Sequence, residues 1–178
     1  MREKDVIRNL KNGETEYIEY VVNTYYGEIY SYLCRKIGNE IEAQDVTQEV
    51  FSKFFVNLHT YQERGKLRNY LLKLATNATN DVFRKSRPEI SFEEAGEIED
   101  LKQTPWETVQ QKEEKEMVKC ALQALPVKQR EVIILRFYHE VPFGDIARIT
   151  DSNLSTVKTR FRRGMENLKK ILEVDYER

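Results

Sequence analysis

Residues 153–168 read NLSTVKTRFRRGMENL, and at helical spacing this stretch has two different faces. Cationic and hydroxyl side chains occupy one face; four of the six residues from Lys158 to Arg163 are basic and none is acidic. Apolar side chains recur every three or four residues on the other face, at Leu154, Val157, Phe161, Leu168 and then Ile171 or Leu172. The stretch therefore predicts an amphipathic helix with a basic outer face.

A shorter helical pattern precedes this stretch. Residues 143–149 read FGDIARI, and a polar turn, TDSN, follows at 150–153. A helix, a short turn and a second helix with a basic face form the plan of a helix-turn-helix DNA-binding motif. Outward Arg and Lys side chains also occur on merely solvated helices, but the preceding helix and turn favour DNA binding. The candidate DNA-contacting residues are Ser155, Thr156, Lys158, Thr159, Arg162 and Arg163.

The net charge of −1 conceals a segregation of charge along the chain. Residues 1–88 carry 14 basic and 12 acidic side chains, residues 89–117 carry 3 and 10, and residues 118–178 carry 12 and 8. Two positive ends joined by an acidic middle suit a protein that touches a polyanion at two places.

Helical periodicity dominates the chain, so we expect an all-α fold. Gly38 is expected to end a long first helix, and Asn39 to cap the next one together with Glu42. Besides the helix-turn-helix pair, the apolar pattern predicts helices over residues 17–37, 39–58, 67–82, 105–125 and 128–138.

The chain divides into two parts by composition. Arg87-Pro88 ends the first group of helices, and an acidic segment with little helical periodicity follows. Thr104, Pro105 and Glu107 then form a capping box that opens another helix. We therefore expect two small helical domains joined by an acidic linker, with boundaries at 1–88, 89–104 and 105–178.

The segment from Arg64 to Arg87 contains seven basic residues and one acid, Asp81. The aromatic Tyr70 and the amides of Asn77 and Asn80 lie among them. Sites for single-stranded nucleic acid use this mixture, because cations hold phosphates, rings stack on bases and amides bond base edges. A solvated charged face has a similar composition, and composition alone leaves both interpretations open.

The residue pattern points to no catalytic, metal or cofactor site. No glycine-rich phosphate loop is present, and the cysteines and histidines are isolated from one another. Asp45 and Glu49 share a helix face without a third ligand or base, which favours an acidic surface for a basic protein partner. No apolar run is long enough to span a membrane and no signal peptide is apparent. We expect a non-enzymatic, cytoplasmic protein that is a monomer when free.

Three motifs together resemble the extracytoplasmic-function (ECF) group of bacterial RNA polymerase sigma factors. Residues 45–51, DVTQEVF, are similar to region 2.2. Residues 66–77, KLRNYLLKLATN, with Asp81 and Arg84 are similar to regions 2.3 and 2.4. Residues 125–132, LPVKQREV, with the helix-turn-helix are similar to region 4. The resemblance covers nearly the whole chain in the family's order, and implies promoter-specific transcription initiation by a region 2 and a region 4 domain.

The resemblance also implies residue roles. Lys158, Thr159, Arg162 and Arg163 match positions that enter the major groove at the minus-35 element. Minus-35 contacts are also implied for Ser155 and Thr156. The loop at 60–66 matches one that captures a flipped base at the minus-10 element. Minus-10 contacts are implied for Arg64, Lys66, Tyr70, Asn77, Asp81 and Arg84. Docking on the clamp helices of the polymerase β′ subunit is implied for Asp45, Gln48, Glu49 and Phe51.

The resemblance implies three partners: core RNA polymerase, promoter DNA and an anti-sigma factor. The polymerase would be bound through its β′ clamp helices and its β flap.

The chain departs from the family pattern at Leu67, Tyr70, Thr76 and Gly164, where Phe, Trp, Arg and Ala are usual.

Two other function classes remain as alternatives. A stand-alone helix-turn-helix regulator that binds an operator as a dimer would explain residues 118–178. It would give no role to the motif at 45–51 or to the basic segment. A helical adaptor without DNA contact would need neither basic surface.

Overall fold

The computed structural model describes residues 2–62, 66–85 and 109–176. All regular secondary structure in these residues is helical, which confirms the all-α prediction. The helices are α1 (Glu3–Lys11), α2 (Glu16–Ile37), α3 (Glu40–Val56), α4 (Leu67–Lys85), α5 (Val109–Ala124), α6 (Val127–Phe137), α7 (Phe143–Ile149) and α8 (Leu154–Tyr176). The predicted linker at 89–104 and the capping box that follows it lie outside the described residues.

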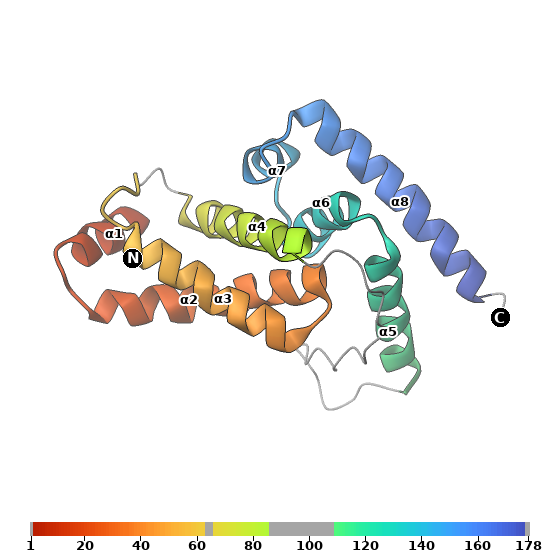
Figure 1. The fold of residues 1–178 in the computed structure, drawn as a ribbon, viewed down its shortest axis with the longest axis horizontal. Helices are drawn as coiled ribbons and strands as arrows, with labels where there is room; N and C mark the ends of the chain where they lie inside the picture. Colours follow the sequence, from red (N-terminus) through yellow and green to blue (C-terminus); the bar gives the residue numbers. More distant parts are fainter. Residues whose placement is uncertain (1, 63–65, 86–108, 177–178) are drawn as a thin grey trace.

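Helices α2, α3 and α4 pack against one another as the first bundle (Figure 1). Gly38 follows α2 with a φ of 86°, a left-handed conformation that glycine adopts without steric cost. The Asn39 side chain accepts a hydrogen bond from the Glu42 backbone N–H at 2.9 Å. Gly38 therefore ends α2 and Asn39 caps α3, as the sequence predicted.

Helix α1 was missed by the sequence analysis, which assigned no helix before residue 17. Val6, Ile7 and Leu10 are buried, and α1 packs on α2. These three apolar residues share one face, so the sequence does carry an amphipathic signal at residues 3–11. A helix of nine residues is too short to be stable alone and depends on the packing of that face.

Helices α5 to α8 form the second group, in which α8 packs along α6 and also contacts α5 and α7. A Cβ atom on Gly164 would lie 2.8 Å from Ile133 Cδ1 and 3.2 Å from Gln129 Cβ. The departure from Ala at this position therefore lets α8 approach α6 closely. Leu154, predicted on the buried stripe, is 44% exposed; it is the first residue of α8, and burial begins one turn later at Val157.

The two groups share one apolar core. Helix α6 contacts α2, and α7 contacts α4. Val132, Ile134 and Leu135 of α6 belong to the same buried cluster as Leu33 of α2 and Leu72 of α4. The sequence predicted the helices of each group, but gave no sign that the groups pack together.

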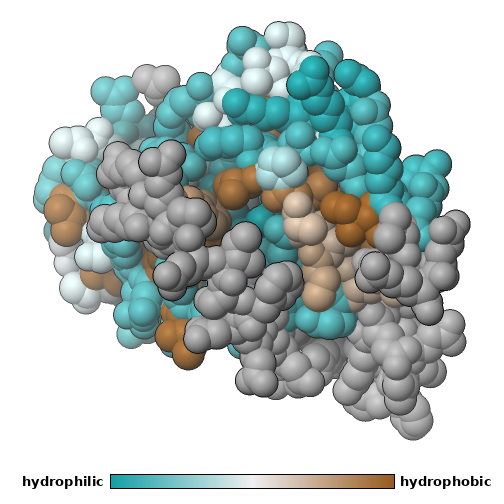
Figure 2. Space-filling view, turned by 45° about the vertical axis from the view of Figure 1, so that its right-hand side comes forward, coloured by the Kyte–Doolittle hydropathy of each residue, from teal (hydrophilic) through white to brown (hydrophobic). Residues whose placement is uncertain are grey.

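A smaller apolar cluster lies between α5, α6 and α8, around Leu122, Leu125 and Ile133. Figure 2 brings the α5 and α8 side of the molecule forward and shows apolar residues gathered in the centre, with hydrophilic residues above them. None of the helices in the described part of the chain has both the length and the apolar character needed to cross a bilayer.

We expect Gly38→Ala to lower the free energy of unfolding by about 1–2 kcal/mol, since the left-handed conformation disfavours a Cβ atom. That atom would also lie 2.8 Å from the Gln123 side chain of α5. Gly144→Ala is the control, because its Cβ would meet nothing within 4 Å. Urea denaturation, monitored by circular dichroism, gives the free energy of unfolding of both variants. Equal losses of stability in Gly38→Ala and Gly144→Ala would contradict the assigned role of Gly38.

Candidate functional site

The outer face of α3 carries three of the four residues predicted to dock on a protein partner. Asp45, Gln48 and Glu49 are exposed, and Glu49 forms an ion pair with Lys53 at 2.5 Å. Phe51 lies on the opposite side, 5% exposed, with its ring centroid 6.0 Å from that of Tyr26. Phe51 thus holds α3 against α2, while the other three form an acidic face, called here the α3 acidic face.

The predicted single-strand site on α4 meets the second domain. Lys66 Nζ lies 2.8 Å from Asp145 Oδ1 of α7, and Lys73 Nζ lies 2.6 Å from Asp151 Oδ1 in the following turn. The hydrogen bond from Lys66 holds the pKa of Asp145 below its usual value. Two cations of this basic segment are therefore neutralised by carboxylates of the helix-turn-helix domain.

Tyr70 is half-buried at the side of α4. Its ring centroid lies 4.7 Å from that of Tyr61 and 6.2 Å from that of Phe54. Asn77 is exposed one to two turns further along the helix. Arg64 and the side chains of Asp81 and Arg84 lie outside the described part of the structure.

Thr76, where the family pattern has Arg, is 1% exposed beneath the second domain. Its hydroxyl shares a 2.8 Å hydrogen bond with the Tyr32 hydroxyl. An arginine side chain would not fit this buried position in the arrangement described. The substitution is therefore consistent with the packing of the two domains.

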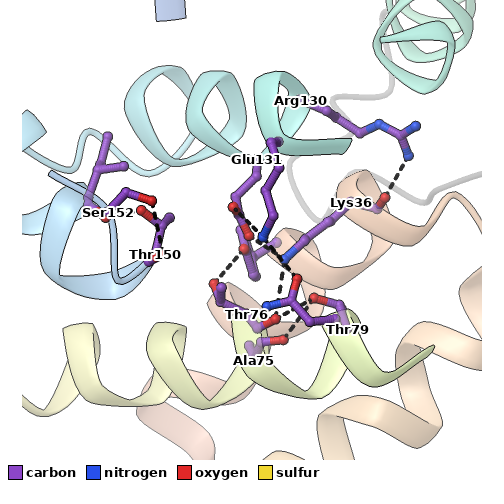
Figure 3. Close-up of polar contacts among 12 residues, drawn as sticks. Lys36, Ala75, Thr76, Thr79, Arg130, Glu131, Thr150 and Ser152 are labelled. Atoms are coloured by element: carbon purple, nitrogen blue, oxygen red, sulfur yellow. Dashed lines mark hydrogen bonds and ion pairs between the residues drawn. The ribbon is translucent and has the colours of Figure 1, made fainter. Parts of the chain in front are cut away.

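A fully buried ion pair lies beside Thr76, between the two domains. Lys36 Nζ of α2 lies 2.5 Å from Glu131 Oε1 of α6, and both side chains are 0% exposed. Figure 3 shows the two side chains pointing toward each other above α4. Burial lowers the pKa of Lys36, and its interaction with Glu131 partly opposes that effect.

Backbone carbonyls reinforce this contact. Arg130 donates to the Lys36 carbonyl at 2.7 Å, and Gln123 donates to the Arg35 carbonyl at 2.7 Å. Burial lowers the pKa of Arg130 to about 10. The C-terminal end of α2 is therefore held by side chains of α5 and α6.

Glu28 joins α2 to α4 and to the second domain. It is hydrogen-bonded by Arg68 of α4 and lies 3.2 Å from His139 Nδ1. Arg68 also donates to the His139 carbonyl at 2.5 Å. Burial opposes the ionisation of Glu28, but the hydrogen bonds from His139 and Arg68 outweigh it and lower the pKa of Glu28 to about 2.

Helix α8 begins with a side-chain cap. Asn153 Oδ1 accepts the Thr156 backbone N–H at 2.7 Å and the Ser155 hydroxyl at 2.8 Å. Five of the six predicted duplex-contacting residues are exposed: Ser155, Lys158, Thr159, Arg162 and Arg163. Thr156 is half-buried. The helix thus presents a surface of cations and hydroxyls to solvent, called here the α8 basic face.

A cavity of about 280 Å³ lies where α6 faces the start of α8. Its lining is Gln129, Ser155, Thr156, Thr159, Arg160 and Arg163. Two guanidinium groups, three hydroxyls and an amide offer many hydrogen-bond donors and no acidic group, which suits a phosphate.

Sequence reasoning missed the residues that join the domains: Lys36, Glu131, Arg130, Glu28 and His139. A usable signal was present for Lys36, which lies four residues after Tyr32 and seven after Ile29, on the apolar stripe of α2. A single charge on an apolar stripe needs a buried partner. Its partner, Glu131, is 95 residues away, and nothing in the sequence connects the two.

We expect Glu28→Gln to lower the free energy of unfolding by about 2 kcal/mol at pH 7, since the carboxylate is stabilised in the folded state. A depressed pKa contributes stability above the unfolded pKa of about 4.3, and that stability is lost as the pH falls toward 2. The difference in the free energy of unfolding between the wild type and Glu28→Gln should therefore become smaller as the pH falls from 5 to 2. Glu19→Gln, at an exposed carboxylate of the same helix, is the control. A difference independent of pH would contradict the role of ionised Glu28.

Known families and solved structures resemble this chain over most of its length. The chain matches the family model for Sigma-70 region 2 at residues 21–89 and that for Sigma-70 region 4 at residues 115–168. The described fold is similar to that of the sigma factor RpoE of Bartonella quintana, solved with the anti-sigma factor NepR, with a TM-score of 0.73, 21% identity and coverage of 88% of this chain and 97% of that one. It is also similar to CnrH, solved with the cytosolic domain of CnrY, with a TM-score of 0.74, 19% identity and coverage of 98% and 99%.

Two curated proteins of Bacillus subtilis are related over most of their lengths. The ECF RNA polymerase sigma factor SigX is 28% identical over 89% of this chain and 85% of its own. The ECF RNA polymerase sigma factor SigW is 31% identical over 95% of this chain and 96% of its own. The chain therefore belongs to the ECF RNA polymerase sigma factors.

Proposed function

We propose that the chain directs promoter-specific transcription initiation through three separate surfaces. The α3 acidic face docks on the β′ clamp helices of core RNA polymerase, α4 reads the opened minus-10 element, and the α8 basic face reads the minus-35 duplex. The observation that carries this proposal is the exposure of an acidic face and a basic face on different helices of one chain. The first suits a basic protein surface and the second a polyanion.

The proposed domains are residues 1–88 for polymerase docking and minus-10 recognition, and residues 105–178 for minus-35 recognition and contact with the β flap. Residues 89–104 are the proposed acidic linker. Two weak DNA-binding domains joined by a linker bind more tightly than either alone, because binding of one raises the effective concentration of DNA at the other.

At the minus-10 element, Lys66 holds a phosphate, Tyr70 stacks near the flipped base and Asn77 bonds a base edge. The packing of Tyr70 on Tyr61 and Phe54 supports this role, because a ring held in place stacks on a base with less loss of freedom. Arg64, Asp81 and Arg84 belong to the same proposed surface.

At the minus-35 element, the cavity between α6 and α8 receives a backbone phosphate, since Arg160 and Arg163 line it. Lys158 and Arg162 extend into the major groove and donate hydrogen bonds to guanine O6 and N7. Thr159 contacts base edges or thymine methyl groups. The hydroxyls of Ser155 and Thr156 add phosphate contacts from the first turn of the helix.

The remaining assignments follow from the family. The protein acts in the cytoplasm on polymerase and DNA and performs no catalysis of its own. The similar RpoE structure holds the anti-sigma factor NepR, and we infer that an anti-sigma factor also restrains this chain. A dimeric operator-binding regulator is not favoured, because it leaves the α3 acidic face without a role.

We expect Asp45→Arg with Glu49→Arg to abolish retention on bacterial core RNA polymerase, because the reversed charges repel a basic partner. The matched control is Glu16→Arg with Glu19→Arg, which reverses two exposed acids on α2. A pull-down measures the stoichiometry of all three proteins. Equal retention of both variants would contradict the assigned docking face, and absence of wild-type binding would contradict the sigma-factor function.

We expect Arg162→Ala with Arg163→Ala to weaken promoter-duplex binding by the holoenzyme about 10–100-fold. The slope of log affinity against log salt should become shallower by about 1, because Arg163 is assigned a phosphate contact and Arg162 a guanine contact. Lys169→Ala with Lys170→Ala, exposed further along the same helix, is the control. Fluorescence anisotropy on promoter fragments selected by the wild-type holoenzyme gives the affinities, and undiminished binding would contradict the assignment of Arg162 and Arg163 to DNA contact.

A further inference from the structure

Helix α1 contacts the chain on both sides of the segment that joins α3 to α4. Lys11, the last residue of α1, donates through Nζ to the Tyr61 carbonyl at 2.6 Å, 50 residues further along the chain. Glu3, the first residue of α1, accepts the Leu67 backbone N–H through Oε2 at 3.4 Å. Figure 1 shows α1 beside the chain that leaves α3. One short helix therefore holds the start of this segment and its end.

These two polar contacts lie at the ends of a helix whose inner face is apolar. Val6, Ile7 and Leu10 belong to the same buried cluster as Tyr61 and Leu67. Burial of the three apolar side chains accounts for the packing of α1 on the bundle, and it requires neither a cation at one end nor a carboxylate at the other. The polar contacts are additional, and each of them constrains a backbone group that lies outside α1.

Tyr61 is constrained at both of its backbone groups. Its N–H donates to the Asn57 carbonyl at 3.1 Å, and its carbonyl accepts the charged donor of Lys11. Its side chain is only 8% exposed, and its ring centroid lies 4.7 Å from that of Tyr70. Tyr70 is the residue proposed to stack near the flipped base. The backbone contact made by Lys11 therefore fixes the surface on which Tyr70 packs.

Glu3 acts at the start of α4. Leu67 is the first residue of α4, and an N–H group in the first turn of a helix has no acceptor within that helix. Glu3 supplies an acceptor for it, and the negative charge is also favourable at a helix N-terminus. The Tyr25 hydroxyl donates to the other oxygen of Glu3 at 3.0 Å, which orients the carboxylate. This first turn carries Tyr70, whose N–H donates to the Lys66 carbonyl at 3.1 Å.

We propose that α1 is a positioning element for minus-10 recognition. Lys11 fixes Tyr61, against which the ring of Tyr70 packs, and Glu3 fixes the first turn of α4. The proposal rests on the minus-10 function assigned above to α4, and it adds two residues that do not themselves touch DNA. Base-binding residues that are already in place lose less conformational freedom when the opened strand binds.

The test compares intact and abasic DNA. Fluorescence anisotropy measures binding of the holoenzyme to a forked promoter fragment, selected by the wild-type holoenzyme, in which the minus-10 non-template strand is single-stranded. Each minus-10 nucleotide is replaced in turn by an abasic one. Loss of the captured base should weaken binding of the wild-type holoenzyme about 10-fold, because the stacking of that base is lost. The largest ratio of intact to abasic affinity is called here the base-capture ratio.

Lys11→Met removes the charged donor and keeps the apolar stem of the side chain. We expect the base-capture ratio to fall from about 10 to about 2, because a displaced Tyr70 stacks poorly on the base. Affinity for the abasic fork should stay near that of the wild type. Lys11→Arg should restore the ratio, since a guanidinium group can donate to the same carbonyl. Lys4→Met is the matched control, because it removes one exposed cation from the same helix.

An unchanged base-capture ratio in Lys11→Met would overturn the proposal, even if binding to every fragment became weaker. A loss of stability or of net charge would act on the intact and abasic forks alike, whereas a positioning role acts only where the base is present.

Glu3→Ala tests the other end of α1. It removes the acceptor of the Leu67 N–H, and the base-capture ratio should fall in this variant as well. Glu3→Gln keeps an acceptor oxygen and should retain most of the ratio. Glu14→Ala, at an exposed carboxylate just beyond α1, is the control. A wild-type ratio in Glu3→Ala would overturn the proposal that both ends of α1 position the site.

The wild-type protein separates failure of this proposal from failure of the proposed function. Equal binding of intact and abasic forks by the wild-type holoenzyme would contradict base capture by α4, and with it the role of α1. Failure of the wild type to bind core polymerase would contradict the sigma-factor function. A wild-type ratio of about 10 that no α1 variant changes would contradict only the positioning role. Circular dichroism establishes that each variant is folded before binding is measured.

Discussion

The Lys36–Glu131 pair determines how the two halves of the chain meet. Both charged groups have no exposed surface, and removing them from water costs several kcal/mol for each ion unless they stay together. They belong to helices α2 and α6, so burying them in register fixes α6 on α2. With α6 in place, α7 lies on α4, and the pairing of Lys66 and Lys73 with aspartates follows from that position.

Each functional surface is made by the amphipathic character of one helix. Helix α3 buries Val46 and Val50 in the first bundle, and this orientation leaves its acidic residues outward. Helix α8 buries Val157 and rests on α6 through Gly164, which leaves its basic residues outward. The same packing that makes the core thus separates the acidic and basic surfaces. In the function proposed above, this segregation of charge on distinct helices allows one small chain to hold a protein and a nucleic acid at the same time.

Local patterns were sufficient to predict most helices, the caps at Gly38 and Asn39, and the outward residues of α3 and α8. They act within a few residues, so the sequence displays them directly. The contacts between the domains were not predictable in this way. Lys36 and Glu131 lie far apart along the chain, and His139 looked isolated because its partner, Glu28, belongs to another helix. Helix α1 was missed although its three apolar residues share one face; because it has only nine residues, its stability comes from packing on α2. Phe51 matched a docking motif but is buried, because a motif does not state which of its members face inward.

The Asn153 cap has a consequence for how α8, the helix proposed to read the minus-35 duplex, would meet DNA. The cap bonds Thr156 and Ser155 in the absence of any nucleic acid, so the first turn of α8 is already ordered. Helix formation therefore contributes no entropic penalty when the duplex arrives, and the loss of side-chain freedom is confined to long cations such as Lys158 and Arg162. Association at this helix should then be close to rigid docking, with a rate set by electrostatic attraction and orientation rather than by folding on the DNA.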